Sequence, residues 1–89
     1  MRFGLAGTGH WAKIVHAPAL ASTAGIRLAG VWGRNEQAAA ALADSHDCVP
    51  YRSFDDLLAE VDAVAFAMPP DVQADLAVRA AAAGRHLLL

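Results

Sequence analysis

One turn constrains the fold of this chain more than any other feature. It follows the short apolar run 3–6, begins a helix-like segment and reads Gly7, Thr8, Gly9, His10, Trp11 and Ala12. In such a G-x-G-x-x-A turn, the first glycine allows a sharp reversal, the second allows backbone to approach a ligand, and the last small residue allows tight helix packing. The free N–H groups of the first helical turn then favour an anion. The motif predicts a site for a dinucleotide pyrophosphate; a tight turn without ligand is the alternative.

The rest of the chain alternates between strand-like and helix-like segments. We expect strands over residues 3–6, 26–32, 48–51, 63–67 and 86–89, and helices over 10–21, 36–44, 53–60 and 72–83. Right-handed crossovers between such strands give a parallel sheet. The pattern therefore predicts an α/β fold, a doubly wound parallel sheet of the Rossmann type, with strand order 3-2-1-4-5.

Local signals refine the helix boundaries. Asn35 is the expected N-cap of the second helix, and Ser53 with Asp56 resembles a capping box for the third. Pro18 is expected to bend or break the first helix, because it lacks an N–H donor and crowds the preceding turn. Spacings of three and four predict one face of that helix made of Trp11, Ile14, Val15, Pro18 and Ala19.

Composition narrows the classes of protein. Eighty-nine residues suffice for one small domain, and a single cysteine, Cys48, excludes an intramolecular disulfide and fits a reducing compartment. The net charge of -2 argues against nucleic acid as a partner. No apolar window of about 18 residues predicts a membrane span, and the amino terminus does not resemble a signal peptide. We expect a cytoplasmic domain that does not contact membranes.

The last residues of the sequence are all leucine. The run 87–89 falls inside a predicted buried strand, and an uncovered apolar strand end invites aggregation. We therefore expect residues 1–89 to be an incomplete dinucleotide-binding domain, ending after the start of its fifth strand, with a substrate domain elsewhere. A short domain whose last strand is covered by a partner is the alternative.

The end of the second predicted strand carries a signal for cofactor choice. NAD-binding folds place an acidic residue about twenty residues past the glycine turn, where it binds the ribose 2′-hydroxyl. Here that position is Gly33, followed by Arg34 and Asn35. A guanidinium without a neighbouring carboxylate can pair with a 2′-phosphate, so these residues predict NADP, with NAD as the second option. An ordinary solvated arginine near a helix start is the alternative interpretation of Arg34.

The fourth predicted strand ends in Met68, Pro69 and Pro70. Open parallel sheets bind ligands beyond the carboxyl ends of their strands. A rigid proline pair without N–H donors offers an apolar surface to a ribose or nicotinamide. Alternatively, the prolines only end the strand and begin the next helix.

Signals for other chemistries are weak. The four histidines lack the spacing of metal ligands, and Cys48 is interpreted as a buried packing residue. No lysine followed by serine or threonine comes after the glycines, which excludes a P-loop. We nominate no catalytic residue and no metal site.

A resemblance extends this interpretation. The chain resembles the start of the glucose–fructose oxidoreductase/inositol dehydrogenase (Gfo/Idh/MocA) family. Four segments carry this resemblance: residues 1–9, His16 to Leu20, residues 61–71 and residues 80–86. The resemblance implies a Rossmann-type cofactor domain with Pro69 and Pro70 near the nicotinamide. It also implies a catalytic Glu-Lys-Pro tripeptide just after the fifth strand and a substrate domain that forms homo-oligomers. Gln73 departs from a histidine of many relatives, and the absence of an acidic residue at Gly33 puts a plain NAD preference in doubt.

These observations predict the cofactor-binding portion of an NAD(P)-dependent oxidoreductase. Hydride transfer would involve a sugar, polyol or similar hydroxy or carbonyl compound, with the acid and base outside this chain. A non-catalytic dinucleotide sensor is the main alternative. A methyltransferase using S-adenosylmethionine shares the glycine turn but normally has an acidic residue where Gly33 stands.

Overall fold

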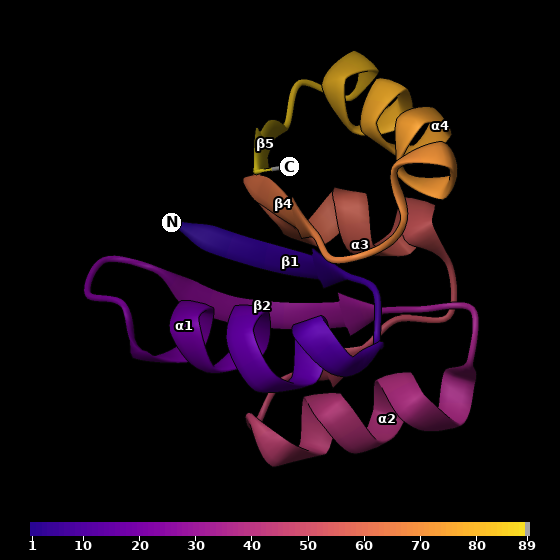
Figure 1. Ribbon diagram of the computed structural model, residues 1–89. Helices are drawn as coiled ribbons and strands as arrows, with labels where there is room; N and C mark the ends of the chain where they lie inside the picture. The colour runs from indigo at the N-terminus through magenta and orange to yellow at the C-terminus, as the bar shows by residue number, and fades with distance from the viewer. Residues whose placement is uncertain (89) are drawn as a thin grey trace.

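The computed structural model describes residues 1–88, with the side chain of Pro70 excepted. Five parallel strands form one sheet in the order β3-β2-β1-β4-β5 (Figure 1). The strands are β1 Arg2–Ala6, β2 Arg27–Trp32, β3 Val49–Pro50, β4 Ala63–Phe66 and β5 His86–Leu88. The helices are η1 Ala12–His16, α1 Ala17–Ser22, α2 Glu36–Ser45, α3 Phe54–Glu60 and α4 Pro70–Ala82. The predicted Rossmann-type sheet and strand order are confirmed; Leu89, in the predicted fifth strand, lies outside the described residues.

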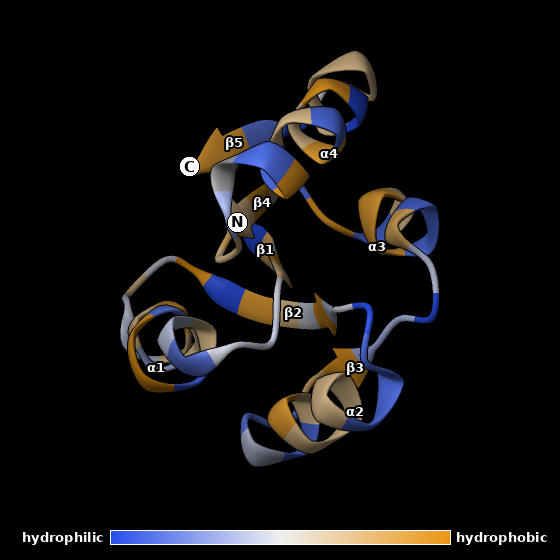
Figure 2. Ribbon diagram, turned by 45° about the vertical axis from the view of Figure 1, so that its right-hand side comes forward, coloured by the Kyte–Doolittle hydropathy of each residue, from blue (hydrophilic) through white to orange (hydrophobic). Residues whose placement is uncertain are grey.

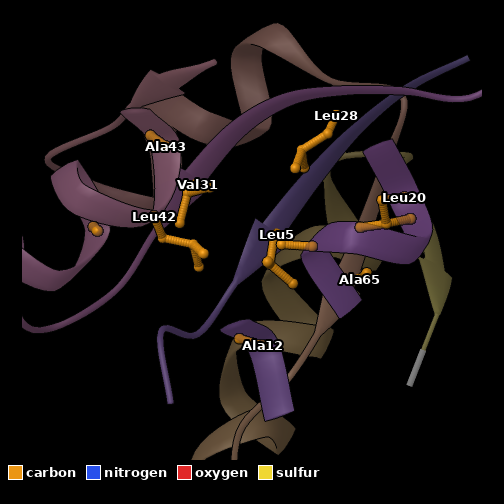
Figure 3. Packing of buried hydrophobic residues seen from close by; sticks show 10 residues of the cluster. Leu5, Ala12, Leu20, Leu28, Val31, Leu42, Ala43 and Ala65 are labelled. Atoms are coloured by element: carbon orange, nitrogen blue, oxygen red, sulfur yellow. The ribbon is translucent and has the colours of Figure 1, made fainter. Parts of the chain in front are cut away.

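The sheet is covered on both faces. Helices α1 and α2 pack on one face, where Leu5, Val31 and Leu42 belong to one apolar cluster (Figure 3). Helices α3 and α4 pack on the other face, around Phe54 and Leu57. Figure 2 shows the two pairs of helices on opposite sides of the strands. A parallel sheet needs this double cover, because its central strands are apolar on both faces.

Both predicted helix caps are present. Ala38 donates its backbone N–H to Asn35 Oδ1 at 3.0 Å, and Asp56 donates to Ser53 Oγ at 3.0 Å. Each bond satisfies a backbone donor that the first helical turn leaves unpaired. These caps set the starts of α2 and α3.

The first helix differs from the prediction at Pro18. The helix is not broken there: the preceding turn, η1, widens to a π-type turn in which Ala17 donates to the Ala12 carbonyl oxygen. Pro18 then lies in the first turn of α1, where its missing N–H costs little. A wider turn accommodates the proline ring that a regular α-helical turn would crowd.

The widened turn also changes which face is buried. Ala12, Ala17 and Leu20 are buried, at spacings of five and three rather than three and four. The predicted apolar face is wrong: Trp11 is 66% exposed and Ile14 54% exposed. One inserted residue turns the following side chains about the helix axis. The 3.6-residue period therefore does not identify the helix face that packs on the sheet.

Two other boundaries shift. β3 is reduced to two residues, and Tyr51 continues the ladder by donating to the Val31 carbonyl oxygen at 2.9 Å. Helix α4 begins at Pro70, two residues before the predicted start, because proline suits the first helical position. The helix ends with Ala83 as its exposed C-cap. Among residues 1–88, no helix has both the length and the apolar character that crossing a membrane requires.

Candidate dinucleotide-binding site

Three strands of the sheet end side by side. Ala6 pairs with Trp32 of β2 on one side and with Phe66 of β4 on the other. The alignment continues into the turns: Gly7 donates to the Trp32 carbonyl oxygen at 2.8 Å, and Ala67 donates to the Ala6 carbonyl oxygen at 2.9 Å. The three turns that carry the predicted site residues therefore meet at one edge of the sheet, where β1 and its two neighbours diverge.

A cleft of about 320 Å³ lies between these turns. Its lining residues are Gly7, Thr8, Gly9, Trp32, Gly33, Arg34, Ala67, Met68, Pro69 and Val72. A neighbouring cleft of about 450 Å³ is lined by Gly9, His10, Trp11, His16, Phe66, Ala67, Met68 and Pro69. The two clefts share four lining residues and run along the carboxyl ends of the strands, which is the extended shape that a dinucleotide needs.

Glycine is needed at positions 7 and 9 for different reasons. Gly7 has φ +121°, and a Cβ atom there would lie 2.3 Å from the Ala67 carbonyl oxygen. Only glycine fits both conditions, so Gly7 is needed for the turn itself. A Cβ atom on Gly9 would meet nothing within 4 Å, and its φ lies outside the left-handed region. The space above Gly9 is open, and without a side chain the backbone there can approach a phosphate closely.

The helix that follows presents unpaired backbone donors. Its first bond runs from the Lys13 N–H to the Gly9 carbonyl oxygen at 3.1 Å. The N–H groups of the three residues between them therefore have no acceptor within the helix. Together with the positive end of the helix dipole, they fit the pyrophosphate of a dinucleotide.

The end of β2 supplies the charge of the site. Gly33 is buried, and the next residue, Arg34, is exposed at the mouth of the cleft. The ion pair found within residues 1–88 joins Arg79 and Asp55, and neither residue lines the cleft. Within this part of the chain, Arg34 therefore has no ion-pair partner. An unpaired guanidinium beside a site without a carboxylate fits a phosphate.

Most of the sequence-predicted site residues line the two clefts, but Ala12 and Asn35 do not. Ala12 is fully buried and packs in the core, and Asn35 caps α2. The side chain of Pro70 lies outside the described residues. Ala12 and Asn35 therefore shape the turns that carry the site instead of facing the cleft.

Several residues that line the clefts were not predicted from the sequence. Trp32 and Phe66 are the last residues of β2 and β4, so the rule that ligands bind beyond carboxyl strand ends could have identified them. No such signal identifies His16. It reaches the second cleft from η1, where its Nδ1 lies 3.1 Å from the Trp11 carbonyl oxygen.

The cysteine lies away from this edge. Cys48 precedes β3 and packs against the α1 and α2 side of the core. Burial raises the pKa of the Cys48 thiol above its ordinary value, and the neighbouring Asp47 carboxylate raises that pKa further. Both effects favour the protonated thiol, which is a poor nucleophile. Within residues 1–88, no three His, Cys, Asp or Glu side chains gather in a way that could hold a metal ion.

Comparison with known proteins identifies the family. The sequence profile of the Gfo/Idh/MocA oxidoreductases, a family with an NAD-binding Rossmann fold, matches residues 1–89. The chain belongs to this family. The family resemblance noted from the sequence is therefore confirmed, and the cleft lies on an NAD(P)-binding Rossmann domain.

Two curated relatives are similar over nearly the whole chain. UDP-N-acetylglucosamine 3-dehydrogenase of Acidithiobacillus ferrooxidans is 39% identical, with 100% of this chain and 28% of the relative covered. Inositol 2-dehydrogenase of Rhizobium meliloti is 40% identical, with 98% of this chain and 26% of the relative covered. The chain spans about a quarter of the length of these relatives.

Solved structures of Gfo/Idh/MocA proteins have the same fold. The Acidithiobacillus ferrooxidans dehydrogenase superposes with a TM-score of 0.88 at 40% identity, covering 98% of this chain and 28% of the other. A 3-ketoreductase from Actinomadura kijaniata, solved with NADP and TDP-benzene, superposes with a TM-score of 0.92 at 27% identity. That match covers 99% of this chain and 28% of the reductase.

Proposed function

We propose that this chain is the cofactor-binding portion of an oxidoreductase that prefers NADP and acts on a sugar, a polyol or a similar hydroxy or carbonyl compound. The observation that carries the proposal is the cleft in which the glycine turn, Gly33 with Arg34, and Met68 with Pro69 converge. The activities of two relatives, on a nucleotide sugar and on inositol, support the substrate class.

Each segment of the cleft has its own part in binding. The open space over Gly9 and the free N–H groups of the first helical turn hold the pyrophosphate. Arg34 pairs with the 2′-phosphate of the adenosine ribose, and Gly33 brings no opposing charge. Met68 and Pro69, which line both clefts, form an apolar wall at the nicotinamide end.

The bound nicotinamide supplies the hydride chemistry, whereas the protein positions the cofactor and sets its surroundings. We place the acid and base of the reaction outside residues 1–89, in the part of the relatives' length that this chain does not cover. This assignment makes cofactor binding the property of this chain that can be measured directly.

The test compares two arginine variants of the intact protein. Arg34→Ala is expected to weaken NADP binding by about 1.5 kcal/mol, about tenfold, and to leave NAD binding unchanged. The low end of the range for a charged hydrogen bond applies because Arg34 is exposed and salt screens it. Arg27→Ala is the matched control, since Arg27 is also exposed but starts β2 at the opposite edge of the sheet.

Dissociation constants for NADP and NAD are measured by calorimetry at matched ionic strength. If both variants lower NADP affinity equally, or if Arg34→Ala weakens NAD as much as NADP, Arg34 does not select the cofactor.

A further inference from the structure

His16 is held at the second cleft by a hydrogen bond to its own helix. It is the last residue of η1, is half-buried, and lines the cleft together with Met68 and Pro69. Its Nδ1 lies 3.1 Å from the carbonyl oxygen of Trp11, five residues earlier in the chain. This bond holds the imidazole ring in one orientation at the cleft.

The partner of Nδ1 also determines where the ring carries its hydrogen. A carbonyl oxygen only accepts hydrogen bonds, so Nδ1 carries the hydrogen and donates it to Trp11. In the neutral imidazole, Nε2 then has a free lone pair and acts as an acceptor. Nε2 lies on the side of the ring away from the Trp11 carbonyl group, and no hydrogen bond found within residues 1–88 uses it. His16 therefore brings to the cleft an acceptor that this part of the chain leaves without a donor.

His16 lies at the end of the site that is remote from Arg34. Arg34 lines only the first cleft and His16 only the second, whereas Met68 and Pro69 line both. A dinucleotide that extends from Arg34 to Met68 and Pro69 therefore ends with its nicotinamide next to the second cleft. Hydride transfer requires reacting atoms about 3–3.5 Å apart, so the substrate must also lie there.

The other walls of the second cleft suit a compound with both C–H and hydroxyl groups. Met68 and Pro69 are apolar, and Trp11, which is 66% exposed, adds an aromatic ring. Small-molecule sites combine such apolar and aromatic walls with a few placed polar groups. Sugars and polyols have hydroxyl groups that donate hydrogen bonds, and Nε2 of His16 is an acceptor.

We infer that His16 is a substrate-binding residue, whose Nε2 accepts a hydrogen bond from a hydroxyl group of the sugar or polyol. The inference rests on the proposed function and deepens it, because it assigns a substrate contact to a chain that otherwise holds the cofactor. The oxidised carbon loses its hydroxyl hydrogen, so the hydroxyl bound by His16 is a neighbouring one that does not react. Its hydrogen bond is the same before and after hydride transfer and therefore contributes to binding more than to the chemical step.

Two substitutions in the intact protein separate the two ring nitrogens of His16. His16→Asn places an amide N–H near the position of Nδ1, so it keeps a donor for the Trp11 carbonyl oxygen and lacks a group at Nε2. His16→Gln places an amide oxygen near the position of Nε2 and loses the donor to Trp11. His46→Asn is the matched control, since His46 is also half-buried but lines a separate cleft with Arg27 at the opposite edge of the sheet.

The probes are inositol and UDP-N-acetylglucosamine, the compounds on which two relatives act, with NADP or NAD as the oxidant. For the probe that wild type oxidises, His16→Asn should raise KM about five- to tenfold, as the loss of one hydrogen bond does, with kcat unchanged. His16→Gln should restore KM most of the way to the wild-type value. The urea midpoint and the dissociation constant for the dinucleotide alone should be the same in His16→Asn, His46→Asn and wild type.

The inference is overturned if His16→Asn keeps the wild-type KM while His16→Gln raises it, because His16 would then act only through the Trp11 carbonyl group. It is also overturned if His16→Asn weakens dinucleotide binding as much as it raises KM, because Nε2 would then contact the cofactor. Oxidation of neither probe by wild type would refute the proposed substrate class, and the hydroxyl contact with it. If wild type oxidises one probe, the proposed function stands whatever the histidine variants do, so the two failures are distinct.

Discussion

Two glycines of the same turn should respond very differently to alanine. At Gly7, alanine must adopt a φ of +121° and places its Cβ 2.3 Å from the Ala67 carbonyl oxygen. The backbone conformation costs about 1–3 kcal/mol. The contact is with backbone held in the sheet by the Ala67 N–H bond to Ala6, so overpacking adds about 1–3 kcal/mol. We expect Gly7→Ala to lower the free energy of unfolding by about 2–6 kcal/mol.

Gly9→Ala is the matched comparison. Its new Cβ meets nothing within 4 Å, and its φ is ordinary, so the free energy of unfolding should change by no more than about 0.5 kcal/mol. Gly9→Ala should nevertheless weaken dinucleotide binding, because the methyl group fills the space proposed for the pyrophosphate. Gly7→Ala should therefore lower the stability of the fold, whereas Gly9→Ala should lower the affinity for the dinucleotide.

Urea unfolding of the intact protein, followed by tryptophan fluorescence, measures the difference. Trp32 is a suitable reporter, since it is half-buried and packs edge-on against Phe54 at 5.4 Å between ring centroids. With an m-value of about 1–3 kcal/mol/M, the Gly7→Ala midpoint should fall by about 1 M or more. Equal midpoints for the two variants would refute the assignment of Gly7 to the turn and Gly9 to the ligand.

Three further outcomes follow from the packing and the caps. Ser53→Ala should cost about 0.5–2 kcal/mol by chemical denaturation, because the first turn of α3 loses its cap; an unchanged midpoint would contradict this. Leu57→Ala should cost about 2–5 kcal/mol in the same assay, since Leu57 is fully buried, and a loss below about 1 kcal/mol would mean that α3 does not pack on the sheet as described. Asp47→Asn should lower the pKa of Cys48 and speed its alkylation by iodoacetamide at fixed pH below that pKa; a rate independent of this change would show that burial alone raises the pKa.

Strand order and parallel pairing were predictable because they follow from simple constraints. Apolar runs separated by helix-like segments force right-handed crossovers, and only a few sheet orders then remain. The starts of α2 and α3 were predictable from Asn35 and Ser53, because a side-chain cap acts on a donor only three residues away. These features depend on residues that are close together in the sequence, so one sequence is enough to predict them.

The first helix shows where such reasoning fails. Pro18 predicts a disturbance of this helix, but not the π-type turn before it, which inserts one residue into the helical period. Because of that insertion, Ala12 and Ala17 face the sheet while Ile14 faces outward. The position of a buried face depends on the exact number of residues per turn, so a single irregular turn invalidates the 3.6-residue pattern.

The site was predictable in its segments but not in its contacts. The glycine turn, the end of β2 and the end of β4 were each recognisable, and the structure places all three around one cleft. The place of His16 at the second cleft depends on the π-type turn, so no spacing in the sequence reveals it. The acceptor at its Nε2 becomes visible only when the partner of Nδ1 is known.

The most direct test of the central claim is a crystal structure of the intact protein with NADP. We expect the pyrophosphate to lie over Gly9 at the start of the first helix, with the 2′-phosphate within hydrogen-bonding distance of the Arg34 guanidinium. The nicotinamide should lie beside Met68 and Pro69. A dinucleotide bound elsewhere, or an adenosine ribose directed away from Arg34, would contradict the account.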